Sequence, residues 1–169
     1  MSAVWSFGAC ERPPQAVPPD FQLEYMEGAV QAEQSGHTFI RILPPAKDTL
    51  VYRVVRGVRY YFVSKQDGKL RRQDVRTATG GICRDDALLI YRAVVRNGFW
   101  RLRAQYGDAE AQEGAYRRLT VTAEGREKTV MMVNTTGRGF RRIVAVLEER
   151  TDPKKNPDIH VKLEFPKVR

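Results

Sequence analysis

The first part of the chain alternates apolar and polar residues in the manner of half-buried β-strands. At 21–25 every second residue is apolar, and Gly28 ends the pattern. A second apolar run at 39–43 stops at Pro44-Pro45, because proline cannot donate a hydrogen bond to a neighbouring strand. Alternation of this kind places one set of side chains on each face of a sheet. We therefore expect two strands here, with a polar loop between them.

The densest strand pattern lies at 51–63, which is rich in β-branched and aromatic residues. Gly57 lies in its middle, so we expect either one strand with a bulge or two strands that meet at a tight bend. The Asp-Gly dipeptide at 67–68 is typical of β-hairpin turns. It predicts that 60–65 pairs with 69–75.

Two later segments have apolar residues at the three- and four-residue spacing of amphipathic helices. In the first, the apolar face runs over 87–95, Cys83 takes the N-cap position and Asn97-Gly98 ends the helix. In the second, the apolar face runs over 140–147, and Asp152-Pro153 stops the helix. We expect both helices to cover the sheet.

A second hairpin and a short last strand complete the predicted elements. Strands at 116–122 and 128–133 are joined at Glu124-Gly125, and alternation returns at 161–165. Because hairpins dominate and no glycine-rich strand-to-helix turn occurs, an antiparallel sheet is the natural solution. We predict an α+β fold in which two α-helices pack on one face of an antiparallel sheet, with extended arms at both termini.

The 169 residues suffice for one domain with a buried core, and 42% hydrophobic residues are typical of a globular chain. We divide the chain into a Pro-rich N-terminal arm at 1–20, a single α+β domain at 21–150, and a basic C-terminal segment at 151–169 that includes the short strand. The arm is the expected docking element. Its candidate contact residues are Phe7, Pro13, Pro14, Pro18 and Pro19.

The charge balance favours an anionic partner. Lysine and arginine number 29 against 20 acidic residues, which gives a formal net charge of +9. Such a balance suits an acidic protein surface, an anionic membrane surface or nucleic acid, without choosing among them. No apolar stretch approaches the roughly 18 residues of a membrane-spanning helix. Two cysteines and two scattered histidines, His37 and His160, predict no metal site, and no motif predicts a cofactor or a small-molecule substrate.

Arginines are the main candidate binding residues. One group lies in the glycine-containing loop at 135–139 and at the start of the second helix that follows it. Positive charge there opposes the helix dipole, so an anion or an acidic partner would relieve it. The other group alternates with aromatic residues in the strands, which suits either nucleic-acid binding or a solvated strand face. The candidate anion or acidic-partner contacts are Arg138, Arg141, Arg142, Arg53, Arg56, Arg59, Arg71 and Arg72.

Two resemblances suggest the bacterial envelope. Phe7-Gly8-Ala9-Cys10 resembles the end of a lipoprotein signal, which implies lipid attachment at Cys10, although the residues before it are few and contain no lysine or arginine. Residues 52–149 resemble an uncharacterised α+β domain of bacterial envelope lipoproteins. The matching pieces are Asp67-Gly68, Asn97-Gly98-Phe99, Tyr106-Gly107-Asp108 and Glu124-Gly125. The resemblance implies a membrane-associated envelope location, with the periplasmic side favoured over the cytoplasm, and no activity.

No arrangement of residues in the sequence indicates catalysis. Cys83, at a helix start, is either a reactive thiol or an ordinary small cap. We therefore expect a non-catalytic accessory or structural subunit that docks on a larger protein assembly, one that could be membrane-associated, through its terminal arms and a basic surface. Three alternatives remain open: a nucleic-acid-binding module using the basic aromatic strands, a lipid-anchored envelope binding protein, and an enzyme built around Cys83.

Overall fold

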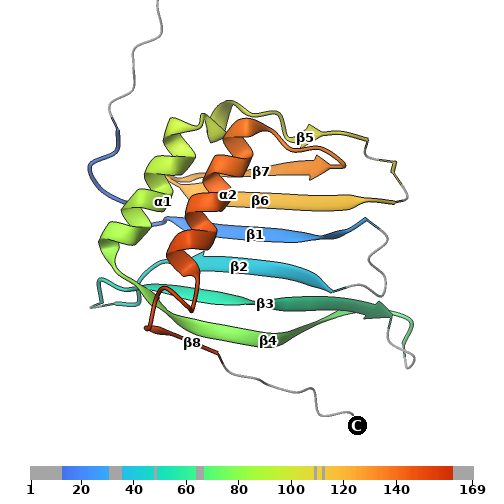
Figure 1. Cartoon of the computed structure of the whole chain (residues 1–169), viewed down its shortest axis with the longest axis horizontal. Helices are drawn as coiled ribbons and strands as arrows, with labels where there is room; N and C mark the ends of the chain where they lie inside the picture. Colours follow the sequence, from blue (N-terminus) through green and yellow to red (C-terminus); the bar gives the residue numbers. More distant parts are fainter. Residues whose placement is uncertain are drawn as a thin grey trace, which may run out of the picture.

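The computed structural model describes residues 13–30, 36–47, 49–63, 67–108, 110–111 and 113–161. It shows one eight-stranded sheet with two α-helices on one face, which confirms the predicted α+β class (Figure 1). Phe7, Cys10 and the apolar positions after Val161 fall outside the described residues, so the interpretations placed on them stay predictions.

The sheet has the strand order β5-β7-β6-β1-β2-β3-β4-β8. Neighbouring strands are antiparallel except for β5 and β7, which pair in parallel. The strands are β1 (Gln22–Ala29), β2 (His37–Leu43), β3 (Tyr52–Val63), β4 (Leu70–Ile82), β5 (Gln105–Tyr106), β6 (Ala115–Ala123), β7 (Arg126–Val133) and β8 (Ile159–Val161).

The two helices lie side by side and antiparallel over one half of the sheet (Figure 1). They are α1 (Arg84–Arg96) and α2 (Arg138–Thr151), and a short 3-10 helix, η1 (Phe99–Arg101), follows α1. Gly139 lies against the carbonyl of Asn97, so the start of α2 contacts the end of α1. At the other end, Arg150 is 3.3 Å from Asp86, which joins the end of α2 to the start of α1.

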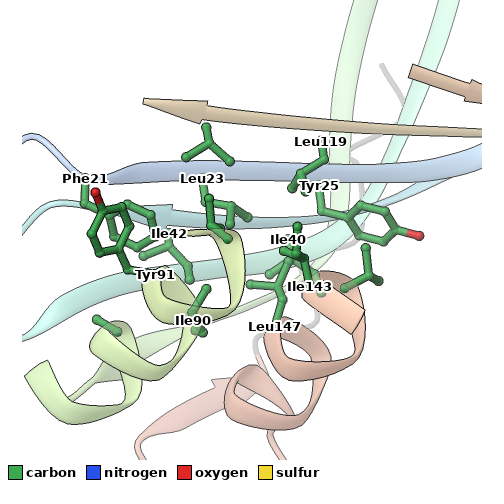
Figure 2. Packing of buried hydrophobic residues seen from close by; sticks show 14 of the residues in the cluster. Phe21, Leu23, Tyr25, Ile40, Ile42, Ile90, Tyr91, Leu119, Ile143 and Leu147 are labelled. Carbon is green, nitrogen blue, oxygen red and sulfur yellow. The ribbon is translucent and has the colours of Figure 1, made fainter. Parts of the chain in front are cut away.

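The core lies between the helices and the sheet. Alternate residues of the central strands, such as Leu23 and Tyr25 of β1, point toward the apolar faces of α1 and α2 (Figure 2). Ile90 and Leu147, one from each helix, are fully buried there. The intervening strand residues therefore lie on the opposite face of the sheet, called the polar face below, as the two-residue period of a strand requires.

Turn chemistry explains both predicted hairpins. Glu124 and Gly125 both have positive φ, at 56° and 68°, which is the geometry of a two-residue type I′ turn. Gly68 also has a positive φ of 65° at the turn before β4. The segment around Gly57 forms one strand, β3, rather than two strands that meet at a bend. The register of β3 with β4 shifts between Arg56 and Val58.

Two features of the sheet were not predicted. β4 continues to Ile82, although the alternation indicated a strand only to Val75. The extension contains Gly80, where a Cβ would collide with the backbone of Asp158 and Ile159 of the segment leading into β8. Glycine is a poor strand former, but position 80 requires it because the backbone of the segment before β8 approaches β4 so closely. β5 is two residues long and has no sequence signal of its own.

The second half of the predicted arm packs against the domain. Val17 is buried in the core, and the Arg92 side chain of α1 donates a hydrogen bond of 2.8 Å to the Pro14 carbonyl. The Asp20 carboxylate accepts the backbone N–H groups of Glu124 and Gly125 at 2.8 and 2.7 Å. These contacts hold the chain from Pro14 to Asp20 along α1 and the β6–β7 turn. Pro13 and Pro19 are exposed, whereas Pro14 and Pro18 are partly buried.

Candidate functional site

The arginines that the sequence groups together do not share one surface. Arg53 and Arg59 belong to the polar face, whereas Arg56 points to the helix side of the same strand. Arg71 and Arg72 lie in β4, and their side chains fall outside what the structure describes. The other three candidates begin α2. The basic surface expected from the sequence is therefore split among at least three places.

Arg56 caps the end of a helix. Its Nη1 donates a 2.7 Å hydrogen bond to the carbonyl of Thr151, the last residue of α2. Burial lowers the pKa of Arg56, while the nearby charges of Asp152 and Glu148 act in the opposite direction. A cation that satisfies a terminal helix carbonyl has a structural role. Arg56 is therefore not available to a partner.

An ion-paired cluster occupies the centre of the polar face. Arg118 lies 3.0 Å from the Glu24 carboxylate and Arg59 lies 3.7 Å from it, while Arg41 contacts the same carboxylate from β2. Arg59 also donates two hydrogen bonds to Asp74, at 2.7 and 3.0 Å. Neighbouring strands supply these groups, so the strand order creates the cluster. We call it the Glu24 cluster; it consists of Glu24, Arg41, Arg59, Asp74 and Arg118.

Arg59 is the most deeply placed member of the cluster. Its side chain is 1% exposed, although no helix of the described chain covers this face. The guanidinium lies 4.8 Å from the centre of the Phe39 ring, and its hydrogen bond to Asp74 raises its pKa. Burial alone would raise the pKa of Glu24, but the hydrogen bond and charge of Arg41, together with Arg59 and Arg118, lower it. The two carboxylates of the cluster offset two of its three guanidinium charges, and these ion pairs join strands of the sheet, which is typical of a structural network.

His37 lies beside this cluster and had no predicted role. It is 5% exposed, and its ring lies between Tyr61 and Tyr116, at ring-centre distances of 5.6 and 6.0 Å. The ring also covers Gly28, where a Cβ would collide with it. Nε2 lies 3.3 Å from the carbonyl of Ala29.

Protonation of His37 is disfavoured by this setting. Burial lowers its pKa, the contact with the Ala29 carbonyl acts against this, and the charges of Arg118 and Arg59 lower it further. Because the folded-state pKa lies below the usual 6.5, the unfolded chain binds more protons as the pH falls through that value. The free energy of unfolding should therefore decrease as the medium is acidified.

We expect the H37Q variant to lose part of this acid sensitivity. The free energy of unfolding is measured by urea unfolding, followed by circular dichroism, at several pH values between about 7.5 and 5.5. Histidine changes charge in that range. The matched control is H160Q, since His160 is exposed on β8 and should keep the wild-type pH dependence. Equal pH dependence in H37Q and the wild type would show that His37 is not the group responsible.

The start of α2 presents the exposed arginines. Arg138, Arg141 and Arg142 are all exposed, and we call them the α2 arginine patch. The N-cap residue is Gly137, which makes no side-chain cap, and the first turn contains no acidic residue. Within the described part of the chain, no carboxylate forms an ion pair with any of the three. Among the arginine candidates whose side chains the structure describes, these three are the group that lies together with all its members exposed.

Cys83 is exposed at the N-cap position of α1, as predicted. Its Sγ is 3.5 Å from the Asp86 carboxylate, which also accepts a hydrogen bond from Arg150. The Asp86 carboxylate is thus shared between the thiol and the Arg150 guanidinium. Across the described ranges, no group of histidine, cysteine and acidic side chains could hold a metal ion, and no helix is long and apolar enough to cross a membrane.

No protein-family model fits this chain, and no curated protein matches it significantly. The resemblance to envelope lipoprotein domains therefore stays a prediction. Function has to be inferred from the chain's own sites, since an α+β fold hosts many unrelated functions.

Proposed function

We propose that this protein is a non-catalytic accessory subunit that docks on a larger protein assembly through its N-terminal arm and the α2 arginine patch. The observation that carries the proposal is the exposure of three arginines without carboxylate partners at an uncapped helix start. Guanidinium groups bind carboxylates with two parallel hydrogen bonds, so an acidic protein surface suits them well.

The position of the patch adds to its preference for an acidic partner. Positive charge in the first turn of a helix is unfavourable by roughly 0.3–1 kcal/mol for each residue. The free N–H groups at the start of α2 also favour negative charge nearby. A carboxylate from a partner would relieve the arginines and satisfy these donors at the same time.

The packing of the arm supports its role as a second contact. The hydrogen bond from Arg92 to Pro14 and the burial of Val17 fix the point from which residues 1–12 start, beside α1 (Figure 1). The partner contact of the arm is therefore assigned to residues 1–12, and Phe7 is the large apolar residue of this segment closest in sequence to Pro13. A truncation that tests the arm should stop at Arg12, because removal of Val17 and Asp20 would also disturb the domain.

We expect two variants to lose the native partner. The tagged chain is purified from the cells that make it, and co-purifying proteins are quantified by mass spectrometry. The combined substitution R138E/R141E/R142E should reduce recovery of the partner at least tenfold, because it replaces attraction with repulsion. Deletion of residues 1–12 should also reduce recovery, while both variants keep the circular dichroism spectrum of the wild type.

The matched control is R53E, which reverses the charge of an exposed arginine on the polar face. Recovery of the same partners at wild-type levels by both test variants would contradict the proposal. Salt-sensitive binding of single-stranded RNA that is lost in the arginine variant would instead support the nucleic-acid alternative. The envelope location and lipid attachment at Cys10 remain separate proposals that rest on the sequence resemblances.

A further inference from the structure

A trough runs along the flank of α2 that faces away from α1. One depression, of about 350 Å³, is lined by the apolar side chains of Phe140 and Val144 and by Ala145. A second, of about 360 Å³, lies over β2 to β4 and is lined by Val58 among others. Tyr25 and Glu148 line both depressions, so the two adjoin. The two adjoining depressions are together called the α2 trough below.

The sheet beyond the trough has no cover among the described elements. Figure 1 shows the strands continuing past α2 on the side away from α1. Val58 of β3 and Val75 of β4 are cross-strand neighbours there and are only half-buried. Tyr60 follows on the same side of β3 and is 41% exposed. The helix-bearing face therefore has an apolar strip next to the trough that neither helix reaches.

We propose that the α2 trough and this strip bind an amphipathic helix of the partner protein, with acidic residues at the end of that helix that lies near the start of α2. This inference rests on the docking function proposed above and names the partner element. A third helix beside α2 would continue the helical layer that already covers half the sheet. Helices bind grooves of this kind through an apolar stripe, which Val58, Tyr60 and Ala145 would receive.

The charged residues that line the trough determine where the acidic residues of the bound helix lie. Arg141, a member of the α2 arginine patch, and Arg117 both line the part of the trough near the start of α2. Arg117 is already 2.7 Å from Glu27, whereas Arg141 has no carboxylate partner in the described chain. Glu148 lies in the middle of the trough and would repel an acidic residue opposite it. The bound helix should thus be acidic at one end only.

A second copy of this chain is a poor occupant. Its exposed helix α2 carries the same three arginines, so self-association through this surface would bring like charges together. The formal net charge of +9 adds to that repulsion. An acidic helix from a different protein avoids both problems, and we commit to it.

The test uses the full chain and a designed peptide of about four helical turns. The peptide has leucines at helical spacing along one face and glutamates at one end; a matched peptide has lysines in place of the glutamates. Amide chemical shifts of the labelled protein should change at Val58, Tyr60 and Ala145 on addition of the acidic peptide. The lysine peptide should bind at least tenfold more weakly.

A blocking substitution ties the binding to the trough. Ala145 is exposed and lines the trough, so A145W fills it without entering the core. A145W should weaken binding of the acidic peptide at least tenfold, whereas T129W, on the polar face, should not. Undiminished binding to A145W, equal binding of both peptides, or shift changes confined to the polar face would each overturn the inference.

Recovery of the native partner by two variants distinguishes the trough from the arginine patch as the binding site. Normal recovery of the partner by A145W, together with its loss in R138E/R141E/R142E, would overturn the trough as its site and still support the arginine patch. Loss in A145W alone would support the trough and overturn the patch as a required contact. Normal recovery by both variants would overturn both.

Discussion

Replacement of Arg59 by methionine should lower the free energy of unfolding by about 3 kcal/mol, the lower end of the cost of breaking a buried ion pair. Methionine keeps much of the length of the side chain but removes its charge. Asp74 then loses two hydrogen bonds, and Glu24 loses one of its three cations. Because both carboxylates are partly exposed, water can replace some of these contacts, which places the expected loss at the lower end.

Urea unfolding followed by circular dichroism at neutral pH measures this change. R53M is the matched control, since Arg53 is exposed on the same face of the same strand. It should change the free energy of unfolding by less than about 0.5 kcal/mol, as is usual for exposed positions. A loss below about 1 kcal/mol in R59M would mean that the Glu24 cluster contributes little, as exposed ion pairs do.

The fold was predictable because its local signals agree with one another. The Asp-Gly and Glu-Gly turns, the Asn-Gly end of α1 and the apolar faces of both helices all agree with the observed elements. Those signals depend on neighbours in sequence. β5 and the end of β4 lack such signals, since they form through contacts with β7 and with the segment that leads into β8.

The polar face shows why the site was only partly predictable. Arg53, Arg56 and Arg59 were taken as one candidate surface, yet residues three apart in a strand lie on opposite faces. Strand alternation alone could have separated Arg56 from the other two. Asp74 lies opposite Arg59 in the predicted β3–β4 hairpin. Glu24 could not have been found from local signals, because β1 comes close to β3 only through the order of the strands in the sheet.

The arm illustrates the same limit. Its proline content correctly indicates a segment without helix or strand, and residues 13–20 contain neither. Nothing local indicates that Val17 enters the core or that Asp20 accepts hydrogen bonds from a turn more than 100 positions away along the chain. In contrast, the α2 arginine patch was found from sequence, because its residues are neighbours along the chain; α2 begins at Arg138, slightly before the predicted start at Phe140.

The F21A variant should show the largest loss of stability, about 4 kcal/mol, within the range for truncating a buried phenylalanine. Phe21 is fully buried just before β1, and its ring lies 5.3 Å from that of Tyr91 and 6.3 Å from that of Tyr52 (Figure 2). Alanine would leave a cavity between α1 and the sheet where all three rings meet. Such a loss is a large share of the 5–15 kcal/mol by which most domains are stable.

Phe21 also connects the packed arm to the domain, so its loss should affect both. Its N–H donates a 3.1 Å hydrogen bond to the Pro18 carbonyl, and Asp20 precedes it at the β6–β7 turn. Urea unfolding gives the stability, and limited proteolysis should cut near Pro18 sooner in F21A than in the wild type. P19A, at an exposed neighbouring position, is the control for both measurements. Faster cleavage without a loss of stability would mean that Phe21 holds the arm but contributes little to the core, contrary to the packing described above.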